Sequence, residues 1–470
     1  MTNSQTGSVP DSRPHVVVVG GGFAGIHAVK ALAGAPVRVT LIDRRVYNTF
    51  QPLLYQVATG GLNPGDVTHF LRALRFKQDN VDVVHEHLME IDTEAKRITL
   101  LNGEEVSYDY LVLANGVTTT YFGTPGAKEY AFSMYSRSQA IKIRDTLFTR
   151  LEKAAQSPTR HDGLRVVIVG GGPTGVEMAG ALAELREQGL MPAYPEIDGE
   201  AFSITVVQRG KDVLKPFTPK LRAYASHQLQ HRGVELMLGA GVAKVLPDAV
   251  ELTDGRRIPS DLTIWATGVA PHEEVTDWSL PLDKGNRIRT GADLQVEGLP
   301  GVFAAGDVAV SPQDLPQLAQ PAIQGGWHAG KQILRLIAGE PTQAFEYYDK
   351  GQLAIIGRRS AIGELPGIAN LPVLHAVPFL RKIPGMSRVV ELTAYPAWWV
   401  WLFVHIGSLL GARNRITTMA GLAVRYGFRF NRKPVPIVGD VPAIRPKRAV
   451  PHSKQEAKAE EDAERADAEL

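Results

Sequence analysis

The chain has 470 residues, of which 44% are hydrophobic and 21% are charged, and its formal net charge at pH 7 is +2. Such a length and composition are typical of a globular protein with two or three domains and a large buried core. The small net charge gives no support for nucleic-acid binding. The sequence contains no cysteine, which excludes disulfides, thiolate metal sites, iron–sulfur clusters and a cysteine nucleophile.

Residues 1–13 are polar and contain no apolar stretch of the kind found in secretory signals. They predict a disordered lead and a protein that stays in the cytosolic compartment. From residue 14 onward the pattern becomes strand, glycine turn and helix, followed by a second strand at 37–43. This order predicts a βαβ unit.

A ten-residue sequence occurs twice with few changes, as VVVVGGGFAG at 16–25 and as VVIVGGGPTG at 166–175. Each copy combines a buried strand, a glycine-rich turn and the start of a helix, which is the pattern of a dinucleotide-binding fold. Two copies in one chain predict two bound dinucleotides. A protein that holds two dinucleotides usually passes electrons from one to the other.

In the first copy each glycine has a separate physical role. Gly20 makes the tight turn, Gly22 lets the backbone approach a pyrophosphate, and Gly25 lets the helix pack closely on the strand. The helix N-terminus then faces the phosphates. Asp43 closes the next strand, where a carboxylate binds a ribose hydroxyl.

The second copy has the corresponding glycines, Gly170, Gly172 and Gly175. Its next strand, at 202–208, ends in Gln208 rather than an acid and is followed by Arg209. An acid at that position would repel a ribose 2′-phosphate and select NAD(H), whereas glutamine does not repel it. Arg209 either attracts such a phosphate or is a solvated surface charge, so the sequence leaves NADPH open.

Two carboxylates have both a functional and an ordinary interpretation. Glu177 lies in the first turn after the second fingerprint, either beside a nicotinamide or simply stabilised by the helix dipole. Asp307 ends the strand of GVFAAGDVA (301–309), where it either binds a sugar-alcohol hydroxyl of a flavin chain or caps a following helix. His85 and His87 share one face of a predicted strand but lack further ligands nearby, so no metal site is predicted.

The longest apolar run, 397–412, is shorter than the roughly 20 residues that a transmembrane helix needs. It contains three tryptophans, Trp398, Trp399 and Trp401, and is followed by four arginines, Arg413, Arg415, Arg425 and Arg429. This pattern predicts an interfacial membrane anchor, with a buried core helix as the alternative. Beyond 430 the chain is rich in proline and then in charge, which predicts a solvated tail or a short charged helix.

Several longer strings are similar to the type II NADH dehydrogenases, a family of two-dinucleotide-binding flavoproteins: FQPLLYQVATGGL (50–62), GPTGVE (172–177), AQPAIQGG (319–326), YYDKGQLAIIGR (347–358) and WLFVHIGSLLGARNR (401–415). The resemblance covers roughly residues 14–430, and AQPAIQ matches the family's AQxAxQ signature. These proteins are single-chain NADH:quinone oxidoreductases that do not pump protons. The absence of cysteine agrees, because related disulfide reductases and sulfide:quinone oxidoreductases need redox cysteines.

The resemblance implies an α/β fold with two Rossmann-like dinucleotide-binding domains, the second inserted in the first, and a C-terminal amphipathic membrane-binding segment. The expected boundaries are a disordered lead at 1–13, an FAD-binding domain at 14–125 and 295–345, an NAD(P)H-binding domain at 160–290, a membrane-anchoring region at 346–430 and a charged tail at 431–470. It also implies a homodimer bound peripherally to the lipid bilayer at the cytoplasmic face of the cell membrane.

The resemblance further implies one non-covalent FAD per chain, NADH as the electron donor and a membrane quinone as the acceptor. The residues expected at FAD are Gly20, Gly22, Phe23, Ala24, Gly25, Asp43, Arg44, Leu88, Asp307, Ala319 and Gln320. Those expected at NADH are Gly170, Gly172, Gly175, Glu177, Gln208 and Gly268. As catalytic residues we expect Glu177, which orients the nicotinamide or tunes the charge beside it, and Gln320 and Gln324, which line the place where quinone meets flavin.

The sequence departs from the family at two places: Gln208 stands where many members have an acid, and the segment 366–391 is longer than usual. Two other functions remain open at this stage. One is a soluble FAD-dependent reductase of a protein partner such as a ferredoxin. The other is a redox-sensing binding protein that holds both nucleotides but turns over slowly.

Overall fold

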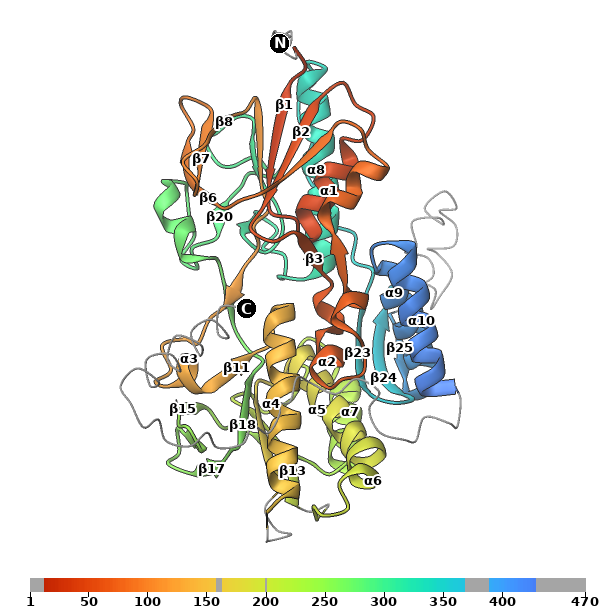
Figure 1. The fold of residues 1–470 in the computed structure, drawn as a ribbon. Helices are drawn as coiled ribbons and strands as arrows, with labels where there is room; N and C mark the ends of the chain where they lie inside the picture. The colour runs from red at the N-terminus through yellow and green to blue at the C-terminus, as the bar shows by residue number, and fades with distance from the viewer. Residues whose placement is uncertain (1–11, 158–162, 199–200, 368–388, 428–470) are drawn as a thin grey trace, which may run out of the picture. The chain divides into compact units, whose positions relative to one another are not determined.

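The computed structural model describes residues 12–157, 163–198, 201–367 and 389–427 (Figure 1). Most of the predicted insertion at 366–391, nearly all of the predicted disordered lead and the whole charged tail therefore lie outside the described residues. Two parallel sheets with helices packed against them make up most of the described chain. The α/β class with Rossmann-like parallel sheets that the sequence predicts is confirmed.

The first sheet has five parallel strands in the order β21-β9-β1-β2-β5. They are β1 (His15–Val19), β2 (Arg38–Asp43), β5 (Val81–His85), β9 (Tyr110–Leu113) and β21 (Val302–Ala304). All five residues of β1 are buried, as expected for a central parallel strand with both faces covered. The last strand comes from a part of the sequence far beyond the others, so the chain leaves this sheet and later returns to it.

The second sheet also has five parallel strands, in the order β11-β18-β12-β13-β14. They are β11 (Ala131–Ser133), β12 (Leu164–Val169), β13 (Phe202–Gln208), β14 (Val234–Leu238) and β18 (Leu262–Trp265). All five of these strands come from the part of the chain between β9 and β21 of the first sheet. The chain crosses between the two sheets at a short antiparallel pair, β10 (Thr118–Thr119) with β19 (Val269–Ala270).

Helices cover both sheets. Those at the first sheet are α1 (Phe23–Ala31) and α8 (Ala319–Ile337), and those of the second half are α3 (Ala127–Tyr130), α4 (Arg137–Ala155), α5 (Pro173–Leu185), α6 (Met191–Ala193) and α7 (Pro219–His231). The short helix α2 (Leu54–Ala58) packs on α4 and α5. The helix α4 begins with a capping box, in which Ser136 accepts from the Gln139 backbone N–H and the Gln139 side chain accepts from the Ser136 backbone N–H. The helix α5 ends in a π-helical turn, Arg186–Leu190.

Small antiparallel sheets decorate the two halves: β3 (Tyr47–Thr49) with β4 (Thr68–Phe70), β6 (Leu88–Asp92) with β7 (Arg97–Leu100) and β8 (Glu105–Ser107), and β15 (Val242–Val245) with β16 (Ala249–Leu252) and β17 (Arg257–Pro259). A short parallel pair joins β20 (Ile288–Arg289) and β22 (Ala309–Val310). Val275, Trp278 and Ile288 pack in one hydrophobic cluster with Val17 of β1. These three residues therefore pack with the core around β1, although they lie within the range 160–290 that the sequence assigns to the NAD(P)H-binding domain.

The C-terminal part of the described chain is a three-stranded sheet followed by two helices. The strands are β23 (Gln352–Gly357), β24 (Ser360–Leu365) and β25 (Val390–Thr393), and the helices are α9 (Ala394–Ser408) and α10 (Ala412–Gly427). The helix α10 is tied to the first half because Asn414 Nδ2 donates to the Thr68 carbonyl oxygen at 2.6 Å and Thr417 Oγ1 donates to Asp66 at 2.9 Å.

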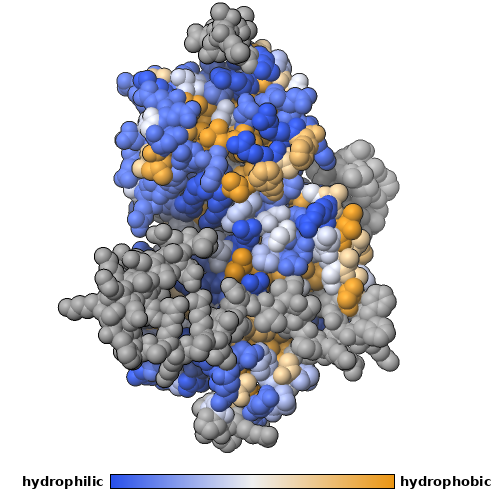
Figure 2. Space-filling view, in the orientation of Figure 1, coloured by the Kyte–Doolittle hydropathy of each residue, from blue (hydrophilic) through white to orange (hydrophobic). Residues whose placement is uncertain are grey.

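The helix α9 has one buried face and one exposed face. Trp398 and Trp401 are buried, whereas Trp399 and Phe403 are 40% and 67% exposed. Figure 2 shows hydrophobic surface at the right-hand edge, where α9 and α10 lie in Figure 1. Within the described ranges we find no helix whose length and hydropathy would allow it to cross a membrane. Arg429, one of the predicted basic flanking residues, lies outside the described residues.

The helices α1 and α8 lie side by side in almost direct backbone contact (Figure 1). A Cβ added at Gly326 would overlap the Ala24 carbonyl oxygen. A Cβ added at Gly330 would lie 2.7 Å from the Ala31 Cβ and 2.8 Å from the Ala28 carbonyl oxygen. Glycine at these positions sets the distance between the two helices, and this distance fixes α8 against the first sheet.

We expect Gly326→Ala to lower the thermal midpoint of unfolding, because the added methyl must push two helix backbones apart, and overpacking of this kind costs about 1–3 kcal/mol. The matched control is Gly421→Ala in α10, where an added Cβ meets nothing within 4 Å. Alanine there should be neutral or slightly stabilising through its helix propensity. Equal midpoints for Gly326→Ala and the natural protein, measured by differential scanning calorimetry, would contradict this packing argument.

Candidate functional site

The first glycine turn connects β1 to α1 through a backbone that other residues could not adopt. Gly20 has φ +102°, and a Cβ there would overlap the Ala114 carbonyl oxygen. A Cβ at Gly25 would overlap the carbonyl oxygen of Gly20 itself. Strand, turn and helix are therefore packed backbone to backbone, as the fingerprint predicts.

Neither fingerprint helix has a side-chain cap on its first N–H groups, and α5 begins with Pro173, which has no N–H of its own. Gly22 is the N-cap of α1 and Gly172 is the N-cap of α5. A Cβ added at Gly22 would come no closer than 4.0 Å to a neighbouring atom, and one at Gly172 would meet nothing within 4 Å. The free N–H groups and the helix dipole make each of these ends suited to a phosphate.

Asp43 stands at the end of β2, directly beside the first turn. Its Oδ2 accepts the Gly21 N–H at 2.5 Å and its Oδ1 accepts the Arg45 N–H at 2.6 Å. Burial raises the pKa of Asp43 above its ordinary value, although both hydrogen bonds lower it. Each carboxylate oxygen keeps a lone pair that can accept from a hydroxyl of a ligand.

Arg44 turns toward the loop after β19. Its Nη2 lies 2.9 Å from Nε2 of His272, whose pKa is lowered to about 4 by burial and by the Arg44 charge. A neutral imidazole therefore accepts the hydrogen bond of the guanidinium at neutral pH. Arg44 directly follows Asp43 at the first turn, and its side chain contacts His272.

The second turn repeats the first with one chemical change. Gly170 has φ +114°, and a Cβ at Gly175 would overlap the Gly170 carbonyl oxygen. At the end of β13, Gln208 Oε1 accepts the Gly171 N–H at 3.0 Å. A neutral amide thus makes the contact that the Asp43 carboxylate makes in the first half. Gly268, at the end of β18, has φ +76°, and a Cβ there would overlap the ring of Phe122.

Asp307 follows β21 at the same edge of the sheet as the first turn. A Cβ at Gly306 would lie 3.1 Å from the Ala24 Cβ, so Asp307 lies close to the start of α1. Burial raises the pKa of Asp307 to about 6. The alternative role as a helix cap does not hold, because the next helix begins only at Ala319.

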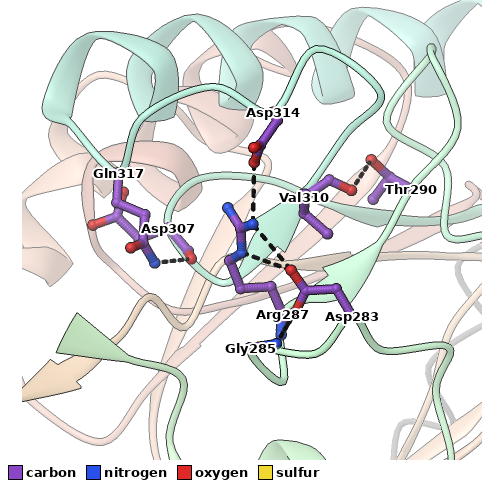
Figure 3. A network of polar contacts seen from close by, with 8 residues as sticks. All are labelled: Asp283, Gly285, Arg287, Thr290, Asp307, Val310, Asp314 and Gln317. Atoms are coloured by element: carbon purple, nitrogen blue, oxygen red, sulfur yellow. Dashed lines mark hydrogen bonds and ion pairs between the residues drawn. The ribbon is translucent and has the colours of Figure 1, made fainter. Parts of the chain in front are cut away.

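A polar network holds the loops around Asp307 (Figure 3). Gln317 Nε2 donates to the Asp307 carbonyl oxygen at 2.9 Å. Arg287 bridges Asp283 at 3.0 Å and Asp314 at 3.1 Å. The Gln317 contact fixes the backbone that presents the Asp307 carboxylate, and the Arg287 ion pairs fix the neighbouring loops.

The two glutamines of the AQPAIQ segment differ in their contacts. Gln320 Oε1 is buried and has no hydrogen-bond partner. The Gln324 amide has a partner at each end, because its Nε2 donates to the Tyr348 carbonyl oxygen at 2.9 Å and its Oε1 accepts the Tyr348 N–H at 3.0 Å. Gln324 therefore ties α8 to the chain leading into β23, and it keeps one N–H and one lone pair for a further partner.

Buried polar atoms without a protein partner gather on segments that meet at the first turn: Thr49 Oγ1, Gln51 Oε1, both side-chain polar atoms of Asn115, and Gln320 Oε1. Asn48 Nδ2 donates to the Gly21 carbonyl oxygen at 2.9 Å, which places 49–51 beside the turn, and Asn115 directly follows Ala114. Each such buried atom costs roughly 1–3 kcal/mol when unpaired. The cluster fits a large polar ligand such as a flavin nucleotide. Gln51 lies in the string 50–62 that resembles the family, but the sequence did not single out Thr49, Gln51 or Asn115 as site residues.

Glu177 is buried at the junction of α5, β23 and α9 and is only 8% exposed. Its Oε1 accepts the Ile355 N–H at 3.4 Å. Burial raises the pKa of Glu177 to about 8, partly opposed by the Ile355 N–H and the nearby Trp401 indole. The indole Nε1 makes no hydrogen bond of ordinary geometry. Glu177 is therefore not a surface partner of the helix dipole.

The other predicted residues have mostly structural surroundings. The Leu88 side chain is buried and its backbone pairs with Leu100. Phe23 packs edge-to-face on Phe50, with ring centroids 5.8 Å apart. Ala24 lies against Gly306 and Gly326, and Ala319 begins α8.

The two histidines of the predicted strand contact different neighbouring residues. His85 Nε2 lies 3.0 Å from the Arg44 carbonyl oxygen, and His87 pairs with Glu274 at 3.5 Å. Among the residues that the structure describes, no three potential metal ligands come together.

Comparisons with known proteins agree with this geometry. The family model described as pyridine nucleotide-disulphide oxidoreductase matches residues 14–326. The type II NADH:quinone oxidoreductase Ndh of Mycobacterium tuberculosis is 33% identical over 434 residues, which is 89% of each chain. The type II NADH:quinone oxidoreductase of Staphylococcus haemolyticus is 30% identical over 358 residues, covering 73% of this chain and 88% of the relative.

Among solved structures, NDH2 of Plasmodium falciparum in complex with NADH superposes with a TM-score of 0.78 at 20% identity, covering 88% of this chain and 99% of that one. At this sequence identity, the structural similarity supports a shared fold and no more. The family match and the bacterial relatives support more: the chain belongs to the pyridine nucleotide-disulphide oxidoreductase family and, within it, to the type II NADH:quinone oxidoreductases.

Proposed function

We propose that this chain oxidises NADH through one non-covalently bound FAD and reduces a membrane quinone, without pumping protons. A bound FAD supplies the two-electron chemistry, because its ring accepts a hydride from a nicotinamide and gives two electrons to a quinone. The protein binds and orients the reacting groups and excludes water from them, so no nucleophilic side chain is needed. The absence of cysteine agrees with a reaction that involves no disulfide.

The observation that supports the proposal best is the cluster of unpaired buried polar atoms at the first glycine turn. The uncapped N–H groups of α1 would hold the pyrophosphate, and Asp43 would accept from ribose hydroxyls. Asp307 would accept from a hydroxyl of the ribityl chain, and Gln320 would use its unpaired oxygen toward the flavin ring or the quinone. The backbone around Leu88 and the Arg44 side chain would border the adenosine.

The second turn would take the nicotinamide nucleotide. The uncapped N–H groups at Gly172 would hold its pyrophosphate, Gln208 would lie beside its adenosine ribose, and Gly268 would border the nicotinamide half. Glu177 would hold a proton beside this junction near neutral pH, since burial disfavours its charged form.

The acceptor side of the proposal depends on the C-terminal helices. Exposed apolar side chains on α9 and α10, among them Trp399, Phe403, Ile416 and Met419, form a surface that a soluble monomer rarely shows. We propose that this surface lies on the bilayer at the cytoplasmic face, as a peripheral anchor close to the quinone. A homodimer is part of the proposal on the strength of the resemblance alone.

The direct test is a visible spectrum of the protein extracted from membranes. We expect a flavin spectrum that NADH bleaches and that a ubiquinone or menaquinone analogue restores, with steady-state NADH oxidation that depends on the quinone. Reduction of soluble dyes without any reduction of quinone in lipid or detergent would contradict the quinone step. Turnover that requires an added ferredoxin would favour the soluble reductase, and a rate near zero would favour the redox sensor.

Glu177 predicts a specific pH dependence of stability. Its pKa is about 8 in the folded protein against an ordinary value of 4.5. Between pH 4.5 and pH 8 the Glu177 carboxyl is ionised in the unfolded chain but protonated in the folded chain. The contribution of Glu177 to the free energy of unfolding is therefore full below pH 4.5 and falls as pH rises toward 8.

Glu177→Gln keeps the shape but cannot ionise. We therefore expect the thermal midpoint of Glu177→Gln, relative to that of the natural protein, to rise as pH increases from 5 to 8. Above pH 8 the difference between the two midpoints should stay constant. Glu184→Gln, which removes another buried carboxylate from the same helix, is the matched control. A constant difference between Glu177→Gln and the natural protein across this range would show that Glu177 ionises normally.

Acidic substitutions on the exposed face of α9 test whether this surface binds the membrane. The double variant Trp399→Glu/Phe403→Glu should bind lipid vesicles on the order of tenfold or more weakly, because each of these side chains contributes roughly 1.5–3 kcal/mol when buried in an apolar phase. The control is Leu101→Glu, which is 63% exposed in the turn between β7 and β8. Vesicle flotation that recovers the double variant as well as the control would rule out α9 as the anchor.

A further inference from the structure

The strand end beside the second glycine turn differs in charge from the strand end beside the first. The first has the Asp43 carboxylate bound to Gly21, and the second has the neutral Gln208 amide bound to Gly171. Gln208 uses its oxygen in that bond. A Cβ built at Gly210 would lie 2.9 Å from Gln208 Nε2, so the amide nitrogen, a donor, lies over the loop that follows.

That loop, residues 209–215, is rich in exposed cations. Arg209, Lys211 and Lys215 are all exposed, and none of them forms an ion pair within the described part of the chain. The one acid in the loop, Asp212, is paired with Arg222 at 2.7 Å. The described residues therefore do not neutralise the positive charge next to Gln208.

The loop is held rigidly against the second turn. The Leu214 N–H donates to the Gly171 carbonyl oxygen at 2.7 Å, and the Gly239 N–H donates to the Gly210 carbonyl oxygen at 2.9 Å. Val213 and Leu214 are fully buried. The cations thus stand on a fixed backbone beside the position where a ribose would lie, which lowers the entropic cost of binding an anion there.

We propose that the segment Gln208, Arg209 and Lys211 is a binding site for a ribose 2′-phosphate, so that this protein accepts NADPH as an electron donor as well as NADH. The inference rests on the proposed function in that the second turn must be the nicotinamide site. A carboxylate at position 208 would repel the phosphate dianion, whereas the amide nitrogen, guanidinium and ammonium groups can all donate to it. Each group acts on the 2′-phosphate and leaves the reacting ring unaffected.

The kinetic test compares kcat/KM for the two nucleotides at low ionic strength. We expect NADPH to be used within about tenfold of NADH. The pair Arg209→Ala/Lys211→Ala should lower kcat/KM for NADPH on the order of tenfold or more while changing that for NADH much less. Gln208→Glu should lower the ratio of kcat/KM for NADPH to that for NADH by a similar factor. Lys244→Ala, an exposed lysine on β15 outside the loop, is the control and should change neither.

A binding test needs no turnover. The probes for isothermal titration calorimetry on the intact protein are adenosine 2′,5′-bisphosphate and AMP, which lacks only the 2′-phosphate. We expect the bisphosphate to bind on the order of tenfold or more tightly than AMP. Added salt or Gln208→Glu should abolish this difference in affinity. Equal binding of the two probes, or NADPH use a hundredfold or more below NADH, would overturn the 2′-phosphate site. NADH turnover in that same preparation would leave the proposed function intact, whereas loss of turnover with both nucleotides would count against the proposed function itself.

Discussion

The close packing of α1, the end of β21 and α8 around Ala24 and Gly25 is the constraint on which the candidate site depends. Gly25 lets α1 touch the Gly20 carbonyl, Gly306 lets the end of β21 approach the Ala24 side chain, and Gly326 lets α8 touch the Ala24 carbonyl. The three glycines come from separate parts of the sequence, and a side chain at Gly25 or Gly326 would overlap a backbone carbonyl oxygen. Because they meet here, the uncapped end of α1, the Asp307 carboxylate and the start of α8 are brought into one region.

The second half of the chain uses the same turn with different surroundings. The first turn is enclosed by unpaired buried polar atoms, which suits a ligand that stays, because removing it would leave those atoms unsatisfied. The second turn is bordered by an exposed, positively charged loop and an open helix end, which suits a ligand that enters and leaves. One fold repeated twice thus supports two kinds of binding, and the difference lies in the residues after the strands.

The sequence predicted those features that depend on short stretches of chain. The two glycine turns, the strand at 202–208 and the α/β class follow from local patterns of apolar residues and glycine, and the structure has them where the patterns are. The contacts of Gln324 with Tyr348 and of Glu177 with Ile355 and Trp401 could not be read in the same way. Each depends on a partner from another element, and no local pattern encodes which element will pack there.

The helix α9 connects the interior of the protein with its exposed apolar surface. Trp401 lies on the buried face beside the Glu177 carboxyl, its ring stacks on His405 with centroids 4.2 Å apart, and burial lowers the His405 pKa to about 4. Trp399 and Phe403 on the opposite face meet solvent. A helix that is apolar all round is usually covered on both faces. The described residues cover one face of α9, so an apolar phase on the other would complete the burial and hold α9 against the Glu177 carboxyl beneath it.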